Sequence, residues 1–185
     1  MSTTSTSAKT SKQGSSSSKA ASTGAELRAA RLAKISAMRD AGVNPFAYSY
    51  VASTNSVALQ EKYGSLKDGE EDPGKTDVSI AGRIMARRVF GKLAFFTVQD
   101  CAGTVQLYLD KNEIDGAMGE GSFANMKAWT DNGDIIGAKG TVKRTEKGEL
   151  SVKVSSWNML TKSLAPLPDK FHGFTDVEKR YRARH

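Results

Sequence analysis

The sequence predicts an all-β core, a small barrel of five strands over residues 77–162, behind a helical extension and a disordered tail. Apolar residues recur with a period of two from residue 77 onward, which is typical of strands, whereas earlier residues show helical spacing. The expected order is three strands, a helix and then a hairpin, which is the order of elements in an OB-fold, a Greek-key barrel. A β-sandwich needs about seven strands and a βαβ fold needs a helix between most strands, so neither fits.

Residues 1–24 form a tail of unusual composition. They contain 14 Ser or Thr, three Lys and no acidic residue, and no large apolar residue follows Met1. Such a segment cannot bury enough apolar surface to offset the entropy of ordering it, so it is predicted to be disordered. Two roles fit it. One is an organellar transit peptide, although the absence of arginine weakens the mitochondrial version. The other is a basic extension that contacts RNA phosphates.

Residues 25–76 are predicted to form the helical extension. A first helix over 25–41 ends before Asn44-Pro45, which cannot continue it. Its apolar residues recur at roughly helical spacing: Leu27, Leu32, Ile35 and Met38. The stretch that follows carries three aromatic residues that are predicted to pack and to tether the helix: Phe46, Tyr48 and Tyr50.

A second helix is predicted over 56–65, with Leu59 and Tyr63 as its buried i, i+4 pair. A surface loop over 67–76, rich in turn residues, leads into the barrel. The barrel elements then follow as strands from 77, over 93–99, 104–110, 134–144 and 149–161, with a connection at 88–92, a loop at 112–121 and a short helix at 123–129.

The two faces of each strand separate by parity. The apolar sets are assigned to the barrel interior: Val78, Ile80 and Ile84; Phe96 and Val98; Val105, Leu107 and Leu109. The opposite, outward face then carries Arg87, Phe95, Thr97, Gln99, Gln106 and Tyr108. A bulge late in the first strand, where an OB strand bends sharply, would exchange Arg87 for Arg88 on this face.

Aromatic rings among polar donors on the outward face indicate a surface that binds single-stranded nucleic acid. A base stacks on a ring such as that of Phe95, a contact worth about 1–3 kcal/mol. Gln106 supplies a donor and an acceptor for a base edge, and Arg87 supplies a fork for a phosphate or carbonyl oxygen. The alternatives are that Phe95 packs under the N-terminal helix and that Gln106 is an ordinary solvated strand residue.

Composition and motifs exclude several other classes of protein. The net charge of +7 fits a polyanionic partner, although it also serves solubility alone. The single cysteine, Cys101, excludes an internal disulfide, and no Cys/His cluster indicates a metal site. No nucleophile–base pair or pair of catalytic carboxylates is visible, so no catalytic residue is predicted. No apolar run approaches the roughly 18 residues of a transmembrane helix, so no membrane partner is expected.

Several runs of the sequence form one recurring pattern: 78–88, 91–100, 103–108, 133–140, 147–151, 160–164, 166–173 and 178–182. This pattern resembles the anticodon-binding domain of class II lysyl-tRNA synthetases of the bacterial or organellar type. The helix that ends at Gly42-Val-Asn-Pro45 fits as well, so the resemblance covers residues 26–185. The family commonly has a Tyr where this chain has His185.

The resemblance implies roles for particular residues. Phe95 corresponds to the aromatic residue that stacks on the middle anticodon base, a uridine, and Gln106 and Arg87 correspond to the groups that hydrogen-bond it. Glu149 corresponds to an acidic residue near another anticodon base. Further candidate RNA contacts are Arg88, Thr97, Gln99, Tyr108 and Lys147. Aspartyl- and asparaginyl-tRNA synthetases share the barrel and the middle uridine, so only the longer runs favour lysine.

The resemblance also implies what surrounds this barrel. Residues 163–185 become a linker into a catalytic domain after residue 185, so the chain alone is expected to be inactive and to need no cofactor. The parent enzyme would attach lysine to tRNA(Lys) with ATP and Mg²⁺, as a homodimer. It would act in the cytoplasm or, if residues 1–24 are a transit peptide, in a plastid or mitochondrion. Two other interpretations stay open: a free-standing binder of single-stranded nucleic acid, and an OB module for protein or sugar partners.

Overall fold

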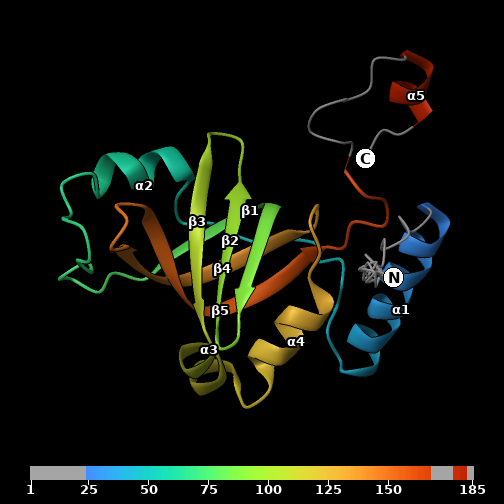
Figure 1. The fold of residues 1–185 in the computed structure, drawn as a ribbon, viewed down its shortest axis with the longest axis horizontal. Coiled ribbons are helices and arrows are strands. Elements are labelled where there is room, and N and C mark those ends of the chain that lie inside the picture. The colour runs from blue at the N-terminus through green and yellow to red at the C-terminus, as the bar shows by residue number, and fades with distance from the viewer. Residues whose placement is uncertain (1–23, 168–176, 183–185) are drawn as a thin grey trace, which may run out of the picture.

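A closed barrel of five strands forms the centre of the computed structural model, which describes residues 24–167 and 177–182 (Figure 1). The strands are β1 (Val78–Phe90), β2 (Leu93–Gln99), β3 (Thr104–Asp110), β4 (Ile135–Arg144) and β5 (Leu150–Thr161). They close in the order β1-β2-β3-β5-β4, and the β3–β5 pair is parallel. The predicted fold class, an OB-type barrel behind N-terminal helices, is confirmed. The predicted disordered tail, apart from Gly24, lies outside the described residues, as does part of the linker.

Helices precede the barrel and interrupt it after its third strand. They are α1 (Gly24–Asp40), α2 (Ser56–Lys62), α3 (Lys111–Met118), α4 (Ser122–Trp129) and α5 (Val177–Arg182). The helices predicted over 25–41, 56–65 and 123–129 are confirmed, with small shifts of their ends. α3 and α4 cover one end of the barrel (Figure 1). None of the described helices is long and apolar enough to cross a bilayer.

The loop predicted over 112–121 is wrong, because α3 occupies most of it. Asp110 caps this helix: its carboxylate accepts hydrogen bonds from the N–H groups of Asn112 and Glu113 at 2.7 and 3.4 Å. Ile114 has no exposed surface and belongs to the barrel core. One cap and one buried side chain therefore outweigh the glycines that indicate a loop.

β1 is the longest strand and pairs with two neighbours. Its first half, Val78–Arg83, pairs with β4, and its second half, Arg83–Phe90, pairs with β2. The register shifts between Ile84 and Ala86, so a bulge at Met85 bends the strand where it passes from one neighbour to the other. This bend lets the sheet close on itself.

The backbone of β2 approaches that of β1 closely just before this bend. A Cβ atom at Gly82 would lie 2.6 Å from the carbonyl oxygen of Gln99, so only glycine fits there. β1 then runs on to Phe90, so the connection predicted over 88–92 is wrong and reduces to the turn Gly91–Lys92. Gly91 takes a φ of 58°, in the left-handed region that favours glycine.

The apolar residues that the sequence assigns to the interior do fill the barrel. All eight belong to one buried cluster, and Ile84, Phe96 and Leu107 have no exposed surface. Phe123 and Met126 of α4 join the same cluster from the end of the barrel. Burying each large apolar side chain contributes about 1.5–3 kcal/mol, so this cluster supplies the main driving force for folding.

The helical extension packs partly as predicted. Leu59 and Tyr63 of the α2 segment are buried, which confirms the predicted pair. The aromatic stretch after α1 is held through its backbone, because the Ala47 N–H donates to the Leu160 carbonyl at 2.8 Å. Tyr48 is fully exposed and Phe46 is 37% exposed, so the prediction that these two rings pack is wrong. Of the three aromatic residues, Tyr50 packs: its ring lies against the backbone at Gly137.

A buried lysine joins the end of β5 to the loop that precedes β4. The Lys162 ammonium group has no exposed surface and lies 2.7 Å from the Asp134 carboxylate and 2.5 Å from that of Asp131. It also donates to the Trp129 carbonyl at 2.8 Å. Burial by itself raises the pKa of Asp131, but hydrogen bonds from Lys162 and Lys34 outweigh burial and hold that pKa below its usual value. The buried charges are therefore paired, as their desolvation requires.

α1 docks on this ionic cluster and on the start of the linker. Lys34 lies 2.7 Å from Asp131, and Ile35 and Met38 are buried beneath the helix. The Arg31 guanidinium donates to three backbone carbonyls: those of Asn132 at 3.1 Å, Ser163 at 2.8 Å and Ala165 at 2.9 Å. These contacts fix α1 beside α4, away from β2 and β3 (Figure 1).

Replacing Lys162 with Met should destabilise the protein by about 3–5 kcal/mol, because it leaves buried carboxylates without their counter-charge. The matched control is Lys139→Met. Lys139 forms an exposed ion pair with Asp77 at 3.1 Å, and losing such a pair costs about 0–1 kcal/mol. Urea unfolding followed by circular dichroism measures both. Equal losses for the two variants would show that the cluster around Lys162 has no special structural role.

Candidate nucleic-acid interface

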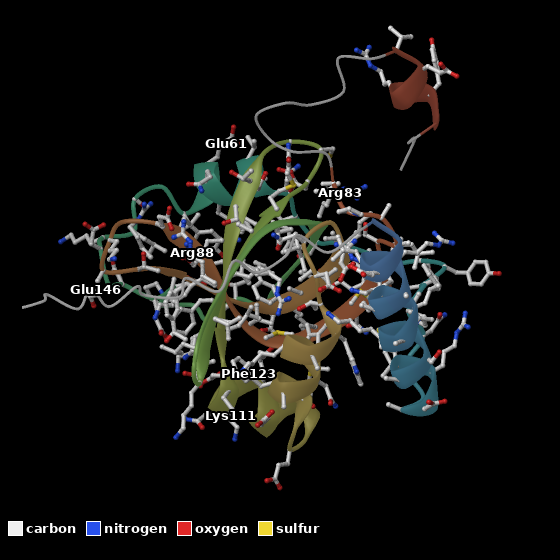
Figure 2. The ribbon with its side chains drawn as sticks, turned by 45° about the vertical axis from the view of Figure 1, so that its right-hand side comes forward. Glu61, Arg83, Arg88, Lys111, Phe123 and Glu146 are labelled. Carbon is white, nitrogen blue, oxygen red and sulfur yellow. The ribbon has the colours of Figure 1, made fainter. Side chains whose placement is uncertain are left out.

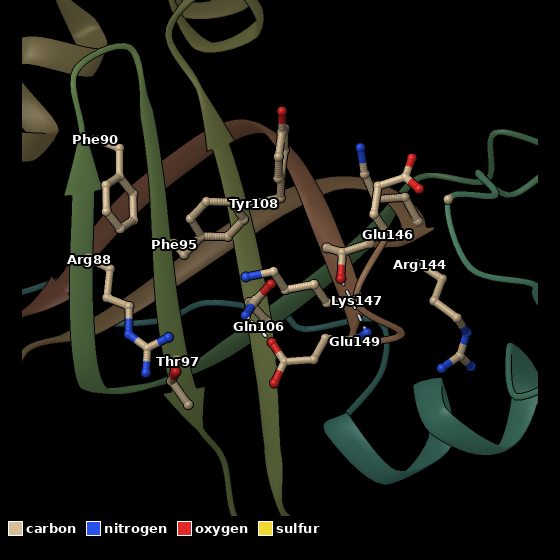
Figure 3. Close-up of a pocket in the computed structure, with 13 residues that line it drawn as sticks. Arg88, Phe90, Phe95, Thr97, Gln106, Tyr108, Arg144, Glu146, Lys147 and Glu149 are labelled. Atoms are coloured by element: carbon tan, nitrogen blue, oxygen red, sulfur yellow. Dashed lines mark hydrogen bonds between the residues drawn. The ribbon is translucent and has the colours of Figure 1, made fainter.

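A hollow of about 420 Å³ opens on the outward face of β1, β2 and β3 (Figure 3). Its floor is formed by Arg88, Phe95, Thr97, Gln106 and Tyr108, and the turn between β4 and β5 forms its wall. The register explains this grouping. Phe95 stands between Arg88 on β1 and Tyr108 on β3, and Thr97 stands beside Gln106. Cross-strand neighbours on one face lie close enough to contact the same ligand.

Three aromatic rings line the hollow, those of Phe90, Phe95 and Tyr108. The Phe95 ring lies edge-on to Tyr108, with centroids 5.4 Å apart, and edge-on to Phe90 at 6.3 Å. Figure 3 shows these rings side by side. α1 contributes no residue to the hollow, so the alternative that Phe95 packs under the N-terminal helix is wrong. Phe90 is 62% exposed, and a large exposed ring at this place is suited to base stacking.

Gln106 is held at the base of the wall by two hydrogen bonds. Its Nε2 donates to the Glu149 carboxylate, and its Oε1 accepts from the Ser151 hydroxyl at 2.9 Å. These bonds fix which end of the amide donates and which accepts. One N–H and one lone pair of the amide remain for a base edge. The alternative that Gln106 is an ordinary solvated residue therefore does not describe its surroundings.

The placement of Arg87 on the outward face is wrong, and Arg88 takes its place. Beyond the bulge at Met85, parity reverses, so Arg87 turns toward α4 and donates to the carbonyl oxygens of Thr130 and Lys127. Burial lowers the pKa of the Arg87 guanidinium, and neighbouring carboxylates partly offset this. Arg88 is exposed and lines the hollow beside Phe95.

The wall carries cations that sequence reasoning did not single out. Lys143 of β4 places its Nζ 4.3 Å from the centroid of the Tyr108 ring, a cation–π contact. Arg144 is anchored by the Gly148 carbonyl at 2.7 Å. Alternation along the fourth strand could have found Lys143, but its apolar neighbours gave no reason to relate it to β3. Burial raises the pKa of the nearby Tyr108 hydroxyl.

The remaining candidate residues divide between the hollow and its surroundings. Thr97, Lys147 and Glu149 line the hollow. Gln99 lies outside it, exposed at the end of β2 opposite Arg83. Cys101 is an exposed free thiol. Within residues 24–167 and 177–182, no group of His, Cys, Asp or Glu side chains is placed to hold a metal ion.

Comparison with known families agrees with this geometry. Residues 78–160 match the family described as an OB-fold nucleic acid binding domain, the tRNA anticodon type. This match lies within the barrel. The match covers β1 to β5 and therefore every residue on the floor of the hollow.

The chain is similar over most of its length to lysine–tRNA ligases. The ligase of Thermosynechococcus vestitus is 60% identical over 163 residues, which are 88% of this chain and 32% of that protein. The ligase of Nostoc sp. is 58% identical, over 86% of this chain and 29% of that protein. The lysine–tRNA ligase, chloroplastic/mitochondrial, of Arabidopsis thaliana is 51% identical, over 86% and 26%. The chain thus spans less than a third of the length of these relatives, and the resemblance to lysyl-tRNA synthetases is confirmed.

Substituting the two adjacent arginines should separate binding from stability. Arg88→Ala should weaken binding of a single-stranded oligonucleotide by about 1.5–3 kcal/mol, the value of a hydrogen bond to a charged group. It should change the free energy of unfolding by less than about 0.5 kcal/mol, since Arg88 is exposed. Arg87→Ala should instead destabilise the fold by about 1–3 kcal/mol, because two carbonyls lose their donor. Fluorescence anisotropy and urea unfolding measure the two effects, and the reverse pattern would restore Arg87 to the binding face.

Proposed function

We propose that the barrel recognises the anticodon loop of tRNA(Lys), as the tRNA-binding part of a lysine–tRNA ligase that uses ATP to attach lysine to tRNA(Lys). The observation that carries the proposal is the hollow with Phe95, Gln106 and Arg88 on an OB barrel of the anticodon-binding family. The names of the relatives support lysine as the amino acid. The aspartyl and asparaginyl alternatives lack such support.

The hollow suits a single base that is turned out of the loop. The exposed face of Phe95 provides a stacking surface, with Phe90 and Tyr108 at its edges. Uracil presents an N–H between two carbonyl oxygens, and the amide of Gln106 can both donate to and accept from such an edge. The carboxylate of Glu149 can accept from an amino group of a neighbouring base. Arg88 and Lys147 supply positive charge for phosphates.

The role of this domain is to position tRNA, and the chemistry takes place elsewhere in the longer protein. ATP and Mg²⁺ serve the lysine-activating step there, and two chains pair as a homodimer. Alone, the 185-residue chain should bind tRNA without aminoacylating it.

The compartment is proposed to be the cytoplasm, with a plastid or mitochondrion as the alternative. The name of the Arabidopsis relative, chloroplastic/mitochondrial, supports the alternative. So does the Ser-rich, acid-free composition of residues 1–24. Imaging a fluorescent protein fused behind residues 1–24 in plant cells distinguishes the two. Import into an organelle would establish a transit peptide, and a diffuse signal would support the cytoplasm as the compartment.

Changing the middle uridine of the tRNA(Lys) anticodon stem-loop to cytidine should weaken its binding to the 185-residue chain. The exchange replaces a carbonyl with an amino group at the edge that Gln106 faces, so hydrogen bonds are lost. Phe95→Ala should weaken binding of the uridine form by about 1–3 kcal/mol. Anisotropy titration of labelled stem-loops measures both.

Tyr48→Ala is the matched control, because Tyr48 is a fully exposed ring that lies outside the hollow. It should bind both stem-loops as the unchanged chain does. Equal affinity of the unchanged chain for the uridine and cytidine forms would reject anticodon recognition and favour a binder of single strands without sequence preference. Absence of binding to any RNA would favour a protein or sugar partner.

A further inference from the structure

The outward face of the barrel continues beyond the hollow around Phe95 toward α1. Along β1 and β2, the row of Arg88 and Phe95 is followed by Ala86 and Thr97, and then by Arg83 and Gln99. Arg83 and Arg88 are five residues apart, an odd spacing that normally puts side chains on opposite faces. The bulge at Met85 cancels this and places both arginines on one face. Figure 2 shows them on β1, with Arg83 nearer to α1.

A second hollow, of about 460 Å³, lies where this face meets α1. We call it the Arg28–Arg83 hollow. Of the described residues that line it, Arg28, Arg83, Thr161 and Ser163 are polar and none is acidic. Lys162 lines it too, but its ammonium group is buried against Asp131 and Asp134. Arg83 donates one N–H to the Gly133 carbonyl at 2.9 Å, which fixes the guanidinium at the edge of the hollow. A rigidly held guanidinium beside the Thr161 hydroxyl is suited to a phosphate.

Arg28 is the least committed cation of this hollow. It is exposed in the second turn of α1, and no hydrogen bond or ion pair of Arg28 is found within the described residues. Glu26 lies two residues away on the helix, a spacing at which side chains do not face each other. The nearby carboxylates of Asp131 and Asp134 are already paired with Lys162 and Lys34. The positive charge of Arg28 is therefore available to a ligand.

We propose that the Arg28–Arg83 hollow binds phosphate groups of the RNA backbone on one side of the anticodon. The proposal rests on the proposed function, since it extends the same bound RNA. Four residues of a regular strand separate Arg88 from Arg83 once the bulge is discounted, which is about 14 Å at roughly 3.4 Å per residue. An OB-fold covers roughly 4–16 nucleotides of a strand, so one bound strand is long enough to reach both arginines. Contacts of arginine with phosphates position a strand and carry no sequence information, so this hollow would add affinity rather than preference for a base.

The test measures how the affinity of the 185-residue chain for the anticodon stem-loop depends on salt. Losing one phosphate contact lowers the slope of log K against log salt concentration by about 0.7–0.9. When salt rises from about 50 to 200 mM, the affinity of every variant falls. The factor by which it falls should be about threefold smaller for Arg28→Ala than for the unchanged chain. Arg28→Lys should keep the slope because it keeps the charge. Arg39→Ala is the matched control, an exposed arginine in the last turn of the same helix.

The variant should also keep its preference for the middle uridine, because phosphate contacts carry no sequence information. Gln106→Ala should do the reverse, losing the preference and keeping the slope, because it removes the amide that reads the base and no phosphate contact. If Arg28→Ala has the slope of the unchanged chain, or if Arg39→Ala changes it equally, the phosphate site is overturned. In that case a retained preference for uridine leaves the anticodon proposal standing. Equal binding of both stem-loops by the unchanged chain rejects that proposal independently.

Discussion

The barrel depends on one strand that serves two neighbours. β1 pairs with β4 along its first half and with β2 along its second half, and a straight strand cannot hold both partners of a closing sheet. The bulge at Met85 supplies the bend, and Gly82 admits the backbone of β2 at a distance that excludes any side chain. Closure in turn encloses the apolar core, to which all five strands contribute.

The same bulge decides which residues meet the ligand. Because parity reverses beyond Met85, Arg88 joins Phe95 in the hollow and Arg87 turns inward. Arg87 bonds the carbonyl of Thr130, the residue before the Asp131 that pairs with Lys162 and Lys34. Two adjacent residues of one strand thus join the binding face to the ionic cluster that holds α1. The position of α1 therefore depends on the same bend, and so does the position of Arg28, which α1 brings to the outward face.

The sequence predicts the parts of this protein that depend on local periodicity. Alternation of apolar residues is enough to assign the core residues and the outward position of Phe95, because burial repeats every two residues along a strand. It fails for Arg87, since a bulge is set by the pairing of β1 with two distant strands. It fails for Phe90 for the same reason, because the strand continues into what looks like a connection. α3 shows a different failure: a single cap at Asp110 decides a helix whose glycines indicate a loop.

Some features of the site come from contacts between segments far apart in the sequence. Lys143 reaches the hollow because β4 and β5 turn back over β3, and nothing near Lys143 in the sequence indicates this. The Tyr48 ring shows the opposite case. An aromatic residue suggests burial, but the backbone bond of Ala47 to Leu160 holds the segment and leaves the ring in solvent. Burial of a ring therefore cannot be inferred from its chemistry alone.

An acidic residue in a basic binding face is explained by what it does to Gln106. Glu149 weakens the attraction for phosphates, which the surrounding cations supply without regard to sequence. It also accepts from Nε2 of Gln106 while the Ser151 hydroxyl donates to Oε1. If the amide were turned over, its oxygen would face the carboxylate, and two acceptors would repel. Glu149 therefore selects one orientation of the amide, and with it the pattern of donor and acceptor offered to a base. Stacking on Phe95 accepts every base, so the ability to discriminate rests on this fixed amide.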